Sequence, residues 1–339
     1  MQALQFFQFY GNSLTGQIPP ELFRINTLTF ISLTYNDLSG TIPPFYGQLG
    51  LTLLALTDNR LSGTIPSSLA TVLNLNSLFL GGNRLNGTIP SGITSLTNLQ
   101  DLHLNNNQLT GEAPPFNRDG IMESLDLTSN RLNGTLNDLF ESLPESISSI
   151  SLNQNQLSGS IPSQVLTRFG KAIRLNLYLN KITGPIPSEI GCMTKLNSLF
   201  LTDNRLTGSI PTEIGLLTDL QTLSLGSNGI SGPLISEIGA LSSLTTLSLK
   251  STSITGTVPN EWSNLVDTLE TFRISESAIQ GNTLDEVMCP NGPELIIRTF
   301  EADCLEQPDS VPPLLVNCSC CTSCCHPDAN ACEDTDIGT

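Results

Sequence analysis

Hydrophobic positions along the chain recur in blocks of the form L-x-x-L-x-L, in which polar residues separate the leucines. Examples are LQDLHLNNN at 99–107 and LNSLFLTDN at 196–204. The L-x-L alternation has the period of two that a β-strand requires, so each block predicts one short strand with one face toward a core. Each block ends at an asparagine and continues as x-L-x-G-x-I-P, as in NRLSGTIP at 59–66.

The blocks recur about every 24 residues and about twelve times, a period typical of stacked repeats. One repeat alone cannot bury its leucines, whereas stacked repeats bury them in a continuous core. Each of these asparagines stands where the chain leaves a strand, so we expect their amides to form a buried ladder and to hydrogen-bond backbone groups. These ladder residues are Asn12, Asn36, Asn59, Asn83, Asn107, Asn130, Asn155, Asn180, Asn204 and Asn228, with Thr252 and Ser277 in the last two repeats.

The full pattern resembles the plant-type extracellular leucine-rich repeat (LRR) of receptor ectodomains and secreted polygalacturonase inhibitors. The resemblance covers residues 4–284. It implies an α/β solenoid, a horseshoe with a parallel concave β-sheet and mostly coil and 3-10 turns on the convex side. Repeat six departs from the pattern, with TLND in place of TIP. We expect this solenoid over 1–288 and a Cys-rich cap over 289–339.

Composition narrows the class of protein and its location. The net charge is -17, and DNA or an anionic membrane would repel such a chain. The chain has no apolar run of roughly 18 residues, so no membrane span is expected in it. Its cysteines favour an oxidising compartment, which predicts an extracellular or cell-surface location. Met1 is not followed by a signal peptide or a polar N-terminal cap, so we expect these, and any membrane tether, in a missing segment.

Cysteines gather near the C-terminus, and in an oxidising compartment they are disulfide candidates. Eight cysteines allow 105 connectivities, although Cys289 and Cys304 are expected to pair and staple the cap. Thiolates at this spacing with His326 would also suit zinc, but we expect disulfides, with no metal and no cofactor. The tail resembles those of algal (diatom) LRR proteins. Cys192, alone in the repeats, is expected to be a buried free thiol. The candidates are Cys289, Cys304, Cys318, Cys320, Cys321, Cys324, Cys325 and Cys332.

Residues between the strand leucines should point to the concave side and form columns, one residue per repeat. The central repeats place aromatic and mixed charged side chains in these columns, whereas later repeats place mainly Ser and Thr there. Aromatic residues and arginine are enriched at binding hot spots, so we predict a site for a protein, peptide or cell-wall saccharide. The predicted site residues are Phe79, Asp101, His103, Asp126, Arg174, Asn176, Tyr178 and Phe200.

Catalysis is not expected. His103, Asp126 and Ser151 share one column, but the acid stands between the other two, and a triad requires histidine in the middle. The chain contains no HExxH, phosphate-binding loop or nucleophile elbow. The alternative to ligand recognition is a structural or adhesion scaffold without a discrete site.

Ice binding is a further alternative, because hydroxyl residues recur three and five positions after each ladder asparagine. Such rows on a flat face would resemble an ice-binding surface. However, Asn86 and Asn133 stand in the same row and are N-glycosylation acceptors in N-G-T sequons, and glycans would roughen the face. Asn317 is a third acceptor, in the cap.

Overall fold

The computed structural model describes residues 4–46, 50–275, 277–279, 287, 299–302, 323–325 and 332–334. The chain forms two compact units, unit 1 (Met1–Gly159) and unit 2 (Ser160–Thr339). The predicted boundary between 288 and 289 falls outside the described residues and stays a prediction. None of the helices in the described part is long and apolar enough to cross a bilayer.

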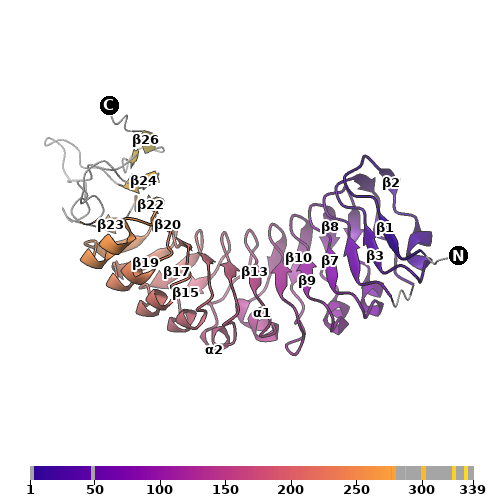
Figure 1. Cartoon of the computed structure of the whole chain (residues 1–339), viewed down its shortest axis with the longest axis horizontal. Helices are drawn as coiled ribbons and strands as arrows, with labels where there is room; N and C mark the ends of the chain where they lie inside the picture. Colours follow the sequence, from indigo (N-terminus) through magenta and orange to yellow (C-terminus); the bar gives the residue numbers. More distant parts are fainter. Residues whose placement is uncertain are drawn as a thin grey trace. The chain divides into compact units, whose positions relative to one another are not determined.

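Each repeat contributes one strand to a parallel sheet (Figure 1). In unit 1 these strands are β1 (Phe6–Gln8), β3 (Phe30–Ser32), β5 (Leu53–Ala55), β7 (Ser77–Phe79), β9 (Asp101–His103), β11 (Ser124–Asp126) and β13 (Ser149–Ser151). In unit 2 they are β14 (Arg174–Asn176), β16 (Ser198–Phe200), β18 (Thr222–Ser224), β20 (Thr246–Ser248) and β22 (Thr271–Arg273). Three strands that follow the last repeat also belong to the sheet: β24 (Thr299–Ala302), β25 (Ser323–Cys325) and β26 (Cys332–Asp334). All of these pairings are parallel except β25 with β26.

The x-L-x-G half of every repeat except the seventh forms a second short strand, and the seventh forms only an isolated bridge between Thr135 and Ser158. In unit 1 these strands are β2 (Thr15–Gln17), β4 (Asp37–Ser39), β6 (Ser62–Thr64), β8 (Arg84–Gly87), β10 (Gln108–Glu112) and β12 (Arg131–Asn133). In unit 2 they are β15 (Thr183–Gly184), β17 (Arg205–Gly208), β19 (Gly229–Pro233), β21 (Ser253–Gly256) and β23 (Ala278–Ile279). The glycine of this motif adopts a positive φ, 73° at Gly87, a conformation that glycine reaches at low cost.

Short helices return the chain to the next strand, and most begin directly after a proline of the I-P motif. In unit 1 they are η1 (Pro20–Arg24), η2 (Ser67–Thr71), η3 (Ser91–Ser95) and α1 (Leu136–Ser142). In unit 2 they are α2 (Ser163–Leu166), η4 (Ser188–Cys192), η5 (Thr212–Leu216), η6 (Ser236–Ala240) and η7 (Asn260–Leu265). Repeat six, which lacks the proline, forms α1 instead, and Thr135 caps that helix by accepting a hydrogen bond from Asp138 N.

The core of each unit is a stack of leucine and isoleucine side chains, with larger residues filling individual layers. Phe140 in unit 1 and Trp262 in unit 2 have no exposed surface. At the first repeat the packing is open, since Phe6, Phe9 and Tyr10 are 64%, 48% and 60% exposed.

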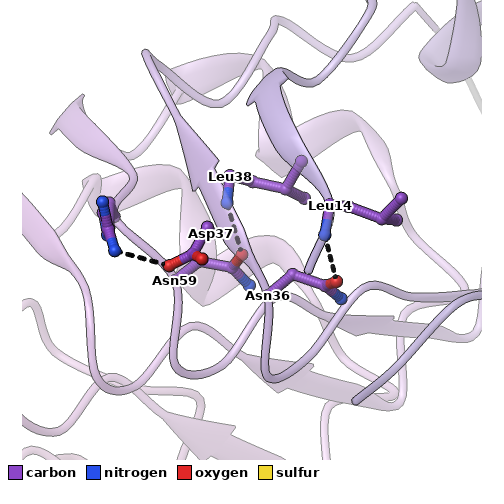
Figure 2. A network of polar contacts seen from close by, with 6 residues as sticks. Leu14, Asn36, Asp37, Leu38 and Asn59 are labelled. Carbon is purple, nitrogen blue, oxygen red and sulfur yellow. Dashed lines mark hydrogen bonds and ion pairs between the residues drawn. The ribbon is translucent and has the colours of Figure 1, made fainter. Parts of the chain in front are cut away.

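The ladder asparagines link neighbouring repeats. Asn59 Nδ2 donates to Leu33 O of the previous repeat at 2.9 Å. Asn59 Oδ1 accepts from Leu38 N at 3.0 Å, as Figure 2 shows. Asn36 accepts from Leu14 N in the same way. These bonds satisfy backbone groups that the sheets leave without partners, and they pin the residue before each asparagine, such as Asp58, in a left-handed turn at φ 51°.

The ladder weakens at its ends. Asn12 is exposed and donates only within its own loop, to Tyr10 O at 3.0 Å. Within the array, Asn180 and Asn204 are also partly exposed. At the last positions Thr252 donates to Leu249 O (2.8 Å) and Ser277 to Ile274 O (2.6 Å), so a hydroxyl supplies one of the bonds that an amide makes.

Candidate functional site

In unit 1, four of the predicted site residues stand on three adjacent strands. Phe79 on β7 pairs in register with His103 on β9, and His103 pairs with Asp126 on β11. The rings of Phe79 and His103 meet edge to face, with centroids 4.9 Å apart. Asp101 lies two residues before His103 on the same strand. We name these four residues the unit 1 cluster.

Hydroxyl groups and one backbone N–H hold the polar members of the unit 1 cluster in place. Ser77 donates to Asp101 Oδ2 at 2.9 Å, and His103 Nε2 lies 2.9 Å from Ser124 Oγ. Asp126 Oδ1 accepts from Thr128 N at 3.0 Å. These side chains are therefore half-buried and held in place, which lowers the entropic cost of binding a ligand against them.

Unit 2 gathers the other four predicted residues on two adjacent strands, and we name them the unit 2 cluster. Arg174 and Asn176 belong to β14, and Tyr178 follows that strand, while Phe200 belongs to β16 and pairs in register with Asn176. The Arg174 guanidinium lies 6.0 Å from the centroid of the Phe200 ring. Asn176 Oδ1 accepts from Tyr178 N at 3.2 Å, which fixes the turn that carries the tyrosine.

A groove of about 480 Å³ borders the unit 2 cluster at the edge where the strands begin. Its lining includes an exposed ion pair between Lys195 Nζ and Asp219 Oδ2, 3.3 Å apart. Ser198, also in the lining, is buried. Sequence analysis identified Arg174 but not this groove, because most of the other lining residues precede the strands and lie outside the columns from which the site was predicted. The lining residues are Ile173, Arg174, Lys195, Asn197, Ser198, Asp219, Gln221 and Ser243.

Sequence analysis also missed the partners of the unit 1 cluster, Ser77 and Ser124. The signal was available, since Ser77 and Ser124 stand in the same column as Asp101 on the two flanking strands. The structure places Asp126 between His103 and Ser151 in register, and His103 contacts Ser124 instead.

The hydroxyl rows of the second strands do not line up as the sequence suggests. Their pairing shifts by two residues per repeat, so Thr183 stands opposite Arg205 and Thr207 opposite Gly229. The equivalent hydroxyls are therefore diagonal neighbours, and other residue types interrupt each row. The ice-binding alternative stays a prediction, with rows that run diagonally across these strands.

Other predicted residues lie away from the two clusters. The glycosylation acceptors Asn86 and Asn133 are exposed on β8 and β12, while Asn317 lies outside the described residues. Cys324, Cys325 and Cys332 belong to β25 and β26, where Cys325 and Cys332 are opposite in register. Cys289, Cys304, Cys318, Cys320, Cys321 and His326 fall outside the described residues.

Cys192 corrects a prediction, because it is free and exposed rather than buried. It ends η4, a 3-10 helix with three residues per turn. Ile190 and Met193, three residues apart, both point into the core, so Cys192 between them points outward. Among the residues that the structure describes, no group of three metal-ligating side chains is placed to hold an ion.

No curated protein sequence matches the chain. A family profile described as Leucine Rich Repeat matches residues 74–96, 98–118, 195–217, 219–241 and 243–265.

Solved structures match over most of the chain. The plant peptide hormone receptor RGFR1, in complex with RGF2, is 31% identical over 89% of this chain and 48% of its own, with a TM-score of 0.82. The Arabidopsis receptor kinase HAESA, in complex with the peptide hormone IDA and the co-receptor SERK1, is 31% identical over 82% and 46%, with a TM-score of 0.77.

A plant ice-binding protein is 26% identical over 81% of this chain and 80% of its own, with a TM-score of 0.53. The chain spans about half the length of the two receptor structures it matches. The repeats, the parallel sheet and these similarities together show that the chain carries leucine-rich repeats in a solenoid fold similar to that of plant receptor ectodomains.

Proposed function

We propose that the chain is an extracellular recognition module that binds a peptide on the outward face of its strand sheet. The observation that carries the proposal is the gathering of aromatic and charged side chains into the unit 1 and unit 2 clusters. The strands after β16 place Ser or Thr at most outward positions, as in β18 (Thr222–Ser224) and β20 (Thr246–Ser248). Both clusters therefore stand out from a face of small hydroxyl residues.

The chemistry of the clusters suits a peptide. Phe79 and Phe200 are partly exposed, so a ligand that covered their rings would remove apolar area from water. This burial would stabilise the complex by about 25 cal/mol per Å². Arg174, Asn176 and Asp101 offer donors and acceptors next to those rings. A rigid aromatic anchor with polar neighbours is the usual composition of a binding hot spot.

The structural relatives support the same class of ligand. The RGFR1 structure contains RGF2, and the HAESA structure contains the peptide hormone IDA. Both share the repeat and the sheet with this chain. We propose on this basis a receptor-like or secreted role at the cell surface, with glycans at Asn86 and Asn133 and disulfides in the tail.

Capture from a cell-surface extract tests the proposal. Immobilised protein would be compared with Phe79→Ala/His103→Ala in the unit 1 cluster and with Tyr178→Ala/Phe200→Ala in the unit 2 cluster. We expect wild type to retain peptides that at least one cluster variant loses. The matched control for the first variant is Tyr46→Ala, an aromatic that is 51% exposed and lies outside the sheet.

The control for the second variant is Leu216→Ala, 58% exposed at the end of η5. Equal retention by all variants would move recognition to another face. Failure of wild type to retain any peptide or protein would contradict the proposal and favour a scaffold role.

A further inference from the structure

The groove beside the unit 2 cluster carries a net positive charge in an otherwise acidic protein. Its lining holds two cations, Arg174 and Lys195, and one carboxylate, Asp219, which Lys195 already contacts at 3.3 Å. In the described part of the chain no carboxylate lies within ion-pair distance of Arg174. Arg205 in the described part also has no carboxylate within ion-pair distance, so what distinguishes Arg174 is its place in the groove lining of a chain whose net charge is -17.

Arg174 is also alone in its column. The following strands place only small hydroxyl residues at the same register position, beginning with Ser198 on β16 and continuing with Thr222 on β18. Ser198 is short and only 6% exposed, so no long side chain from β16 stands beside the guanidinium at this register position. The centroid of the Phe200 ring lies 6.0 Å from Arg174 Cζ, and this cation–π contact does not neutralise the charge of the guanidinium.

Further donors surround the same space. Ser198 Oγ donates to Asn197 Oδ1 at 2.8 Å, which occupies the acceptor of that amide and leaves its Nδ2 hydrogens to face other partners. Gln221 adds a second amide to the lining. A carboxylate has two oxygens and about four acceptor sites, which match a guanidinium flanked by amide donors.

We propose that this groove receives the carboxylate of an Asp or Glu side chain of the bound peptide, and that Arg174 selects for it. The inference rests on the proposed function and adds a specificity rule to it. Alternate side chains of an extended peptide lie about 7 Å apart on one side. A peptide crossing β14 and β16 can therefore place an apolar residue against Phe200 and an acidic residue in the groove.

Selection of phage-displayed random peptides on the immobilised full chain tests the rule. We expect wild type to enrich peptides that combine an acidic residue with an apolar or aromatic neighbour. Arg174→Gln should lose the acidic preference and weaken the affinity of the selected peptides by about 10- to 100-fold, the usual worth of a charge-assisted contact. Arg174→Glu should shift the preference to Lys or Arg at the same position.

The control variant is Arg205→Gln, which removes another exposed arginine, on β17 and outside the groove. It should select the same peptides as wild type. Circular dichroism of each variant checks that the fold is retained, and Arg174→Lys keeps the charge, so it should keep part of the acidic preference.

The outcomes separate the inference from the proposed function. Peptides enriched without an acidic residue, or an acidic preference that survives Arg174→Gln, would overturn the inference and leave peptide binding standing. A wild type that enriches no peptide would overturn both. Retention of immobilised polygalacturonate in place of peptides would also overturn both, because it would assign the groove to an acidic saccharide.

Discussion

The edges where the strands begin differ between unit 1 and unit 2. In unit 1 the polar side chains at this edge bond to each other. Asn76 donates to Gln100 Oε1 at 2.8 Å, and Ser77 donates to Asp101 Oδ2 at 2.9 Å. In unit 2 the equivalent positions carry Ile173 and Arg174 in one repeat and again Asn and Ser, Asn197 and Ser198, in the next, and a groove of about 480 Å³ opens beside them.

The backbones at these two edges are equivalent. Ser77 pairs with Asp101 between β7 and β9 as Arg174 pairs with Ser198 between β14 and β16. The leucines and ladder asparagines fix this common frame, while the outward positions are free to vary. The same frame therefore supports a closed polar surface in one unit and an open cationic groove in the other.

Loss of the largest buried side chain should cost both units the same, because the core belongs to the shared frame. Trp262→Ala in unit 2 and Phe140→Ala in unit 1 should each lower the free energy of unfolding by about 3–5 kcal/mol. Trp262 also loses the bond from Nε1 to Ile235 O, 2.9 Å long. Urea denaturation followed by circular dichroism measures both effects, and a loss below about 1 kcal/mol in either unit would break the equivalence.

Substitution of a ladder asparagine should have the next largest effect on the free energy of unfolding. Asn107→Ala in unit 1 and Asn228→Ala in unit 2 should each cost about 1–3 kcal/mol, since Leu85 N and Leu206 N would lose their buried acceptor. The exposed Asn12 is the control, and its replacement by alanine should change stability by under about 0.5 kcal/mol. Thermal or urea unfolding of the three variants would contradict the ladder account if Asn12→Ala cost as much as the other two.

The edges themselves should differ in a double-mutant cycle. Ser77 and Asp101 in unit 1 should show a coupling free energy of about 1 kcal/mol, because a hydrogen bond joins them. The equivalent pair in unit 2, Arg174 and Ser198, should show almost none. Equal coupling in both cycles would mean that the two edges are not chemically distinct.

The exposed ion pairs should give the smallest effects. Arg60–Asp37 in unit 1 (2.7 Å) and Lys195–Asp219 in unit 2 (3.3 Å) are each more than a third exposed. Each coupling should be about 0.2–1 kcal/mol at low salt and should fall as salt is added. A coupling in the Lys195–Asp219 cycle that resists salt would show that the groove is less accessible to water than we infer.

Most of the frame could be predicted from the sequence, because its determinants recur. Leu102 and Leu104 alternate with His103, and this alternation alone places His103 on the outward face. Ladder position Asn107 was likewise predictable from its spacing. The repeat gives no such information about contacts across strands, so the bond from His103 to Ser124 requires the register as well as the pattern.

Two features were beyond the pattern for physical reasons. The groove depends on which side chains are small, such as Ser198, and on where Lys195 and Asp219 meet. The stagger of the second strands depends on backbone pairing, and for this reason Thr183 faces Arg205 instead of another hydroxyl. Both are properties of three-dimensional packing that no single repeat encodes.

Site-specific cross-linking tests the central claim most directly. A photo-reactive phenylalanine analogue would replace Phe200 in the unit 2 cluster or Leu216 on η5, and each protein would be irradiated with a peptide selected by the wild-type chain. The account predicts a cross-link from position 200 and none from position 216. A cross-link from position 216 alone would show that the peptide binds away from the strand sheet and would contradict the account.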